Sequence, residues 1–170
     1  DKTGDEGYLR DNMANLQRVA SVLLNLQDSD GLIFVKPNSK TKYLMDNAEN
    51  YLGLMRWAET LNKLGEKDEA KIFYDAALKV KEGINTRLYN PKEGCYAWVL
   101  SWYGKRYPRN GVWDPDGVSQ VSLILNRVFE PSSTDARSIW ERFNEHFPRW
   151  PHGEKNDVFP WVNIAFTAGL

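Results

Sequence analysis

Residues 43–80 read YLMDNAENYLGLMRWAETLNKLGEKDEAKIFYDAALKV, and this stretch predicts two helices joined by a tight turn. Apolar residues recur at helical spacing on both sides of the turn, over about 47–64 and then from Phe73 to Ile84. Gly65 lies between the two runs, where a helix usually ends. Two helices with so short a connection run antiparallel, so the stretch predicts an αα-hairpin.

The same periodicity continues on both sides of this hairpin. Residues 9–27 show an amphipathic pattern before it, and the sequence DGVSQVSLILNRV (116–128) shows one after it. A fifth helix carries apolar residues from Ala136 to Phe147, and a sixth begins near Pro160 and runs to the last residue. Six successive helices predict an all-α protein of about three antiparallel αα-hairpins.

The predicted connections alternate in length. Long ones follow the first helix (28–45), the third (89–115) and the fifth (148–159), and short ones follow the second and fourth. Because antiparallel helices alternate in direction, all the long connections are expected at one end of the bundle. Loops on a rigid scaffold usually carry binding and catalytic groups, so this end is expected to hold the functional site.

One long connection contains a change of period. The sequence CYAWVLSWYGKRYPR (95–109) alternates over two short runs. Gly104 and Lys105 join the runs and suit a two-residue turn, so we predict a small β-hairpin here.

Composition excludes several classes of protein. The chain has 170 residues, of which 42% are hydrophobic, and we expect one domain over residues 1–170. A net charge of −1 predicts neither nucleic-acid nor membrane binding, and no apolar run approaches the roughly 20 residues of a membrane span. One cysteine and two histidines provide no disulfide and no Cys/His zinc framework. We predict no cofactor and no metal, and the sequence indicates no particular cellular compartment.

Acidic residues precede or open the helix that follows each long connection. They are Asp46 and Glu49 in the first case, Asp114 and Asp116 in the second, and Glu154 and Asp157 in the third. Helix N-termini hold carboxylates ionised and oriented, which suits a nucleophile, a general base or a hydrogen-bonding anchor. The acids of different hairpins converge on one cleft if these helices line a common axis.

Helix capping is the alternative explanation for these acids. Asp46 as N-cap with Glu49 three residues later is an acidic capping box, and Asp116 with Ser119 is a weaker version. Capping does not account for the convergence of acids from separate hairpins. The two roles are compatible, so we expect Asp46 to cap its helix and point into a shared cleft, and Glu49 to serve the cap.

Aromatic residues are abundant, with seven Trp and eight Tyr, and many lie in the predicted loops. Such rings either close the edge of a core or stack on flat ligands such as sugars or bases. The second long connection contains Trp98, Trp102, Tyr103, Tyr107 and Trp113. The cations Lys105, Arg106 and Arg109 flank the same hairpin, where they suit a solvated tip or an acidic sugar.

A helical-repeat interaction module is a competing interpretation. The sequence LNKLGEKDEAKIFYDAAL resembles a tetratricopeptide-type hairpin. No second copy appears at the offset of about 34 residues that such repeats require, and the long connections break the period. The repeat interpretation is therefore the weaker one.

Three stretches together resemble the six-hairpin glycosidases: QDSDGL (27–32), YLMDNAENYLGL (43–54) and WDPDGVSQ (113–120). The resemblance extends over about residues 9–170 and includes the outer helix and the aromatic hairpin between these motifs. These glycosidases are (α/α)6 barrels of alternating inner and outer helices. The resemblance therefore implies about three of six hairpins, a chain that is part of a larger α/α barrel, and the remaining half of the barrel as its partner.

The resemblance implies a carbohydrate-active protein, in the first place a glycoside hydrolase for an oligo- or polysaccharide. Catalytic acids in such barrels come from the starts of inner helices, and the matching positions are Asp46, Glu49 and Asp116, with Asp30 a weaker match. The implied substrate-binding residues are Tyr43, Asn47, Tyr51, Trp98, Trp102, Trp113, Asp114 and Gln120.

Glycoside hydrolysis needs two carboxylates, one to protonate the leaving oxygen and one to activate water or attack the anomeric carbon. Asp46 and Glu49 lie three residues apart on one helix, whereas Asp46 and Asp116 come from different hairpins. We therefore predict that Asp46 and Asp116 face one cleft, with Glu49 bonded to one of them or to a sugar hydroxyl. The alternatives are a non-catalytic glycan-binding α/α protein and the helical-repeat module.

Overall fold

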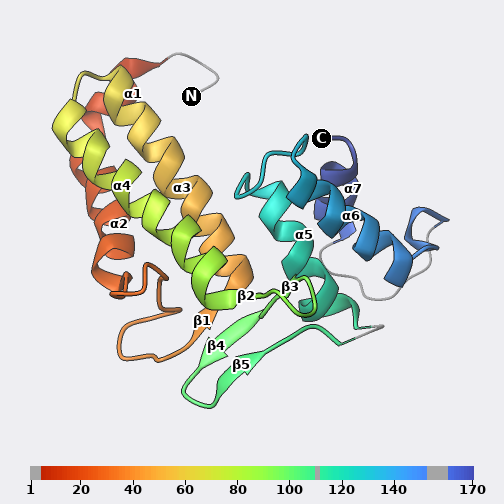
Figure 1. Ribbon diagram of the computed structural model, residues 1–170. Helices are drawn as coiled ribbons and strands as arrows, with labels where there is room; N and C mark the ends of the chain where they lie inside the picture. Colours follow the sequence, from red (N-terminus) through yellow and green to blue (C-terminus); the bar gives the residue numbers. More distant parts are fainter. Residues whose placement is uncertain (1–4, 110–111, 153–160) are drawn as a thin grey trace.

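The computed structural model describes residues 5–109, 112–152 and 161–170. It confirms the predicted fold class, since antiparallel helices dominate and a small β-hairpin lies within a long connection (Figure 1). The α-helices of the described residues are α1 (Glu6–Asp11), α2 (Met13–Leu26), α3 (Leu44–Lys63), α4 (Lys67–Gly83), α5 (Val118–Leu125), α6 (Thr134–His146) and α7 (Trp161–Ala168). Short helical turns lie at η1 (Ile84–Leu88), η2 (Trp113–Gly117) and η3 (Trp150–His152).

The αα-hairpin predicted from residues 43–80 is α3 and α4, which pack along their lengths. Leu54 and Leu61 of α3 and Val80 of α4 are buried in the shared core. Gly65 joins the helices with a φ of +91°, a conformation that glycine adopts without steric cost. The hairpin is therefore specified by its two apolar stripes and the glycine between them.

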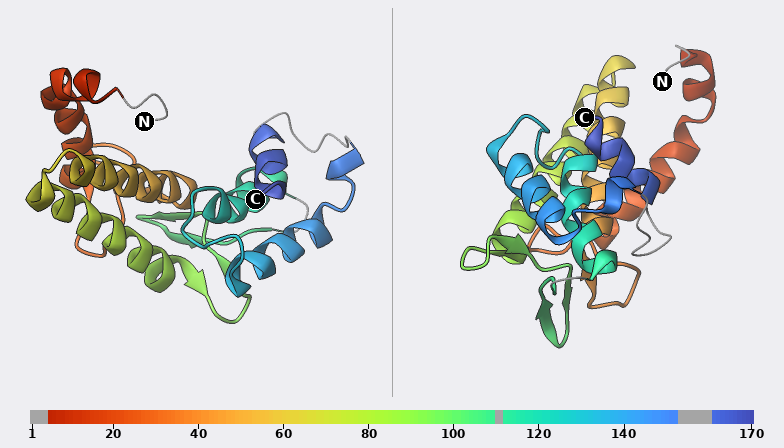
Figure 2. Two further views of the ribbon diagram at one scale, coloured as in Figure 1. Left: turned by 90° about the horizontal axis from the view of Figure 1, so that it is seen from above. Right: turned by 90° about the vertical axis from the view of Figure 1, so that its right-hand side faces the viewer.

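The helices form an inner row and an outer set. α3 contacts α5, and α5 contacts α7, whereas α4 packs against α3 and α6 against α5. Figures 1 and 2 show α4 alongside α3 and α6 alongside α5. A second apolar cluster, built around Trp113, Phe143 and Phe147, joins η2 to α6. This order of inner and outer helices is the arrangement expected of consecutive αα-hairpins.

The single helix predicted over residues 9–27 is wrong in one respect. The structure divides it into α1 and α2 at Asn12, whose backbone is not helical (φ −103°, ψ 3°). The Asn12 side-chain amide donates to the carbonyl oxygen of Tyr8 at 2.9 Å. Asparagine side chains compete with the backbone for such bonds, so Asn12 favours a helix boundary.

Two small antiparallel sheets lie at the end of the molecule where α3 and α5 begin (Figure 1). The larger sheet has the order β1-β4-β5, and the smaller pairs β2 with β3. Their bounds are β1 Lys42–Tyr43, β2 Tyr89–Asn90, β3 Cys95–Tyr96, β4 Val99–Ser101 and β5 Gly104–Arg106.

The β4–β5 hairpin has a different turn from the predicted one. Ser101 pairs with Gly104, so the loop residues are Trp102 and Tyr103, and Lys105 is in a strand. Gly104 supplies its positive φ of +100° at the first position of β5 rather than within the loop. The edge strand β1, which was not predicted, pairs with β4 and fixes this register.

The first two long connections lie at one end of the helices, as their lengths predicted (Figure 1). The third includes residues outside the described ranges. None of the described helices combines the length and the apolar character needed to cross a membrane.

Candidate functional site

A hollow of about 230 Å³ lies where α3 and η2 begin. Its lining residues are Tyr43, Met45, Asp46, Trp98, Asp114, Pro115 and Ser119. Pairing of β1 with β4 brings the first two long connections together here, and the Leu44 amide donates to the Trp98 carbonyl at 3.0 Å. Acids from two different hairpins therefore line one cavity, which we call the Asp46–Asp114 hollow. Glu154 and Asp157 of the third connection lie outside the described residues.

Asp46 lies in the first turn of α3 but does not cap the helix. The N-cap residue is Tyr43, and no side chain supplies a capping hydrogen bond, so the predicted capping box is wrong. The Asp46 carboxyl is half-buried, and this burial raises its pKa above the ordinary value, opposed by a hydrogen bond from its own backbone amide. A carboxyl with a raised pKa holds its proton more readily, as a proton donor must.

Glu49 lies on α3 outside the Asp46–Asp114 hollow, and its role in a cap is not observed. It shares with Asp46 a neighbouring hollow of about 200 Å³ between α2, α3 and the loop that joins them. Burial raises the pKa of the Glu49 carboxyl, and the charge of Asp46 raises it further. Asp46 therefore lines both of these hollows, whereas Glu49 lines the one between α2 and α3 and not the Asp46–Asp114 hollow.

Asp114, rather than the predicted Asp116, shares the hollow with Asp46. Asp116 has no exposed surface, and one of its oxygens accepts hydrogen bonds from the Arg109 backbone amide at 2.8 Å and Nε at 3.4 Å. Asp114 has an extended backbone (φ −120°, ψ 132°) inside the tight turn η2. The two acids of DPDG therefore occupy different environments: Asp116 closes its own loop, and Asp114 lines the cavity.

Two of the predicted stacking aromatics form a pair at the hollow. The rings of Tyr43 and Trp98 lie 6.3 Å apart and within 5° of parallel. Tyr51 and Trp113 are instead buried in the two cores, so neither ring can stack on a ligand in this structure. Trp102 lies at the hairpin tip, where 81% of its surface is exposed.

The two amides predicted to bind substrate hold backbone groups in place. Asn47 is completely buried; its oxygen accepts from the Ile33 amide at 2.7 Å, and its nitrogen donates to two carbonyl oxygens, those of Ile33 and Tyr43, at 3.1 and 2.8 Å. Gln120 bonds both the amide and the carbonyl of Tyr96 at 2.9 Å. Buried backbone groups need such partners, which explains why these amides do not line the Asp46–Asp114 hollow.

Lys42 is a residue that the sequence analysis missed. Its buried ammonium lies 2.7 Å from a carboxylate oxygen of Asp28 and 2.7 Å from one of Asp30. The hydrogen bond from Lys42 is the main cause of the lowered pKa of Asp28. Asp30, the weaker catalytic match, is therefore held in an ion pair. The signal in the sequence was the presence of Asp28, Asp30 and Lys42 in one long connection, which could have predicted this ion pair.

The described residues contain no group of three or more His, Cys, Asp or Glu side chains that could hold a metal ion.

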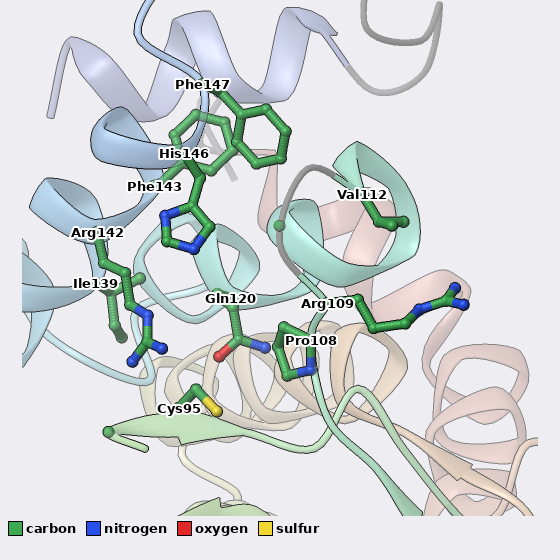
Figure 3. A pocket seen from close by; sticks show the side chains of 12 residues that line it. Cys95, Pro108, Arg109, Val112, Gln120, Ile139, Arg142, Phe143, His146 and Phe147 are labelled. Atoms are coloured by element: carbon green, nitrogen blue, oxygen red, sulfur yellow. The ribbon is translucent and has the colours of Figure 1, made fainter.

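A second cavity lies between α5, α6 and β3 (Figure 3). Arg142 and His146 project toward it from α6, above Gln120 and Cys95. Burial raises the pKa of the Cys95 thiol, which favours its protonated form. No carboxylate is among the described residues that line this cavity, so it does not suit chemistry that needs paired acids.

The sequence matches no protein-family model and no curated protein. The structure is similar to the GH78 family rhamnosidase of Bacillus sp. GL1, with a TM-score of 0.63 and 16% sequence identity. The match covers 80% of this chain but only 15% of the rhamnosidase chain. At this identity the likeness concerns the fold alone. The chain therefore shares its α/α fold with part of a glycosidase.

Proposed function

We propose that the chain is part of a carbohydrate-active protein that hydrolyses glycosidic bonds in the Asp46–Asp114 hollow. The observation that carries this proposal is the lining of one cavity by two carboxylates and a stacked Tyr43–Trp98 pair. Aromatic rings of this kind suit the flat faces of sugar rings, and paired carboxylates suit glycoside hydrolysis. The fold shared with a rhamnosidase supports the same class of reaction.

In this proposal Asp46 is the general acid. Its pKa is raised by burial, so its carboxyl retains a proton closer to neutral pH and can deliver it to the leaving glycosidic oxygen. Asp114 is the second carboxylate, which activates a water molecule or attacks the anomeric carbon. The rate should fall as pH rises through the pKa of Asp46, because the acid then loses the proton that the leaving group needs.

Neighbouring residues position these two acids. Asn47 ties the start of α3 to the preceding loop, and this holds Asp46 at the edge of the hollow. Asp116 binds the Arg109 backbone and side chain, and this closes the loop that carries Asp114. In this proposal Asp116 is a positioning residue, and Glu49 binds a sugar hydroxyl in the neighbouring hollow.

The test is hydrolysis of a panel of oligosaccharides and rhamnosides by the full-length protein. Asp46→Asn and Asp114→Asn should each lower kcat/KM by about 100-fold or more, because each removes a group that acts in the transition state. Asp75→Asn is the control, since this exposed acid pairs with Lys71 on α4 and lies outside the hollow. Absence of hydrolysis across the panel, or full activity in both hollow variants, would contradict the proposal.

A non-catalytic glycan-binding protein is the second candidate, and the Tyr43–Trp98 stack favours it independently of the acids. This function predicts that wild type binds oligosaccharides without releasing products and that Asp46→Asn and Asp114→Asn retain the affinity. Trp98→Ala should then abolish binding. Calorimetry beside a product assay separates the two functions.

We also propose that further helices of a barrel pack against this chain. Val19 and Val22 of α2 and Val162 and Phe166 of α7 are exposed apolar residues. Burying such side chains is favourable by about 25 cal/mol per Å² of apolar surface. Their substitution by Ser should weaken association with those helices, as measured by co-purification of separately produced segments.

A further inference from the structure

Tyr43, which lines the hollow, also belongs to the β1-β4-β5 sheet. The register places Tyr43 opposite Val99 and Val99 opposite Arg106. Residues that lie opposite each other in antiparallel strands project to the same face, and neighbours along a strand project to opposite faces. Arg106 therefore shares a face with Tyr43, which lines the hollow, whereas Lys105 belongs to the other face with Lys42.

The Arg106 side chain is exposed. Within the part of the chain that the structure describes, neither Arg106 nor Lys105 takes part in an ion pair. Adjacent strands are about 4.8 Å apart, so the Arg106 backbone lies roughly 10 Å across the sheet from that of Tyr43. A ligand that fills the hollow and extends along this face would reach the guanidinium.

Two exposed aromatic side chains lie at the tip of the hairpin that carries Arg106. Trp102 and Tyr103 form the two-residue loop between β4 and β5 and are 81% and 89% exposed. Rings this exposed bury little apolar surface, so packing does not explain them. Pairing of β4 with β1 ties the tip to the strand that carries Tyr43.

We propose that this face binds an anionic saccharide unit of a chain whose neighbouring unit occupies the hollow. A guanidinium forms paired, charge-assisted hydrogen bonds with carboxylate or sulfate oxygens, and the tip rings suit a sugar face. The Asp114 carboxylate disfavours a negative charge inside the hollow, so the charged unit belongs outside it, at Arg106. The inference rests on the proposed function and makes its substrate an acidic polysaccharide.

The test is the affinity of the full-length protein for three oligosaccharides of equal length: neutral, uronate-containing and sulfated. Arg106→Gln should weaken binding of an acidic chain by about 10-fold or more and leave the neutral chain unchanged, because a charge-assisted bond is lost. Lys105→Gln is the matched control, with the same charge change one residue away on the opposite face, and should stay within about 2-fold. The two acidic ligands distinguish a carboxylate from a sulfate as the bound group.

The tip is tested with Trp102→Ala, and Tyr74→Ala on α4 is the exposed aromatic control. Trp102→Ala should weaken neutral and acidic chains alike, since stacking does not depend on charge. The inference is overturned if Arg106→Gln and Lys105→Gln have equal effects, or if neutral and acidic chains bind equally. Hydrolysis of neutral chains beside such a result would leave the proposed function standing. Arg106-dependent binding of acidic chains without hydrolysis of any chain would support the anionic site and contradict the proposed hydrolytic function.

Discussion

Replacing Asn47 by Ala should destabilise the fold strongly, because this buried side chain satisfies three backbone groups. It bonds the Ile33 amide at 2.7 Å, the Ile33 carbonyl at 3.1 Å and the Tyr43 carbonyl at 2.8 Å. A buried group left without a partner costs about 1–3 kcal/mol. Water can hydrogen-bond some of the three groups that lose their partner. The expected loss in the free energy of unfolding is therefore about 3–5 kcal/mol.

Urea denaturation followed by circular dichroism measures this loss through the midpoint and slope of the transition. Asn50→Ala is the matched control, because Asn50 lies one turn further along α3 and is not completely buried. Its expected cost is below about 0.5 kcal/mol. A loss below about 1 kcal/mol for Asn47→Ala, or equal losses for both variants, would refute the anchoring role of Asn47.

Two further predictions concern the loop between α2 and α3. Lys42→Met should lower the free energy of unfolding at neutral pH. The difference in this free energy between the variant and wild type should become smaller as pH falls below 3.8, the ordinary pKa of Asp28. The lowered pKa of Asp28 means that its contribution is present above that pH and is lost as the carboxylate is protonated; urea titrations at several pH values measure the difference. Gly31→Ala should cost about 3 kcal/mol or more, because φ is +85° and the added Cβ would lie 2.1 Å from the Lys79 carbonyl oxygen. Gly53→Ala is its control and should stabilise α3 by about 1 kcal/mol, since nothing lies within 4 Å of the added Cβ; a similar loss in both variants would contradict the role of Gly31.

The helices were predictable because each carries its own signal. The apolar stripes of α3 and α4 and the left-handed turn at Gly65 depend on residues close together in sequence. The hairpin turn was not predictable to the residue, because pairing with β1 sets its register from outside the hairpin. The boundary between α1 and α2 was not predicted, because the hydrogen bond of the Asn12 side chain leaves no trace in the spacing of apolar residues.

The hollow lies at the end of the helices where the sequence predicted the site, but its lining residues match the predicted ones only in part. Asp46 follows from its place at the start of an inner helix. The choice between Asp114 and Asp116 depends on the direction in which each side chain leaves a tight turn, which the motif DPDG does not encode by itself. Asn47 and Gln120 look like ligand-binding amides in sequence, but distant backbone groups use them.

The central claim is that Asp46 and Asp114 act as one pair in a shared hollow. A double-mutant cycle on kcat/KM tests it most directly, with Asp46→Asn, Asp114→Asn and the combined variant assayed on the best glycan of the panel. Groups that act in the same transition state are strongly non-additive, so the combined variant should lose little more activity than either single variant. The claim would be contradicted if the fold-loss in kcat/KM of the combined variant equalled the product of the two single losses. It would also be contradicted if either single variant kept wild-type activity.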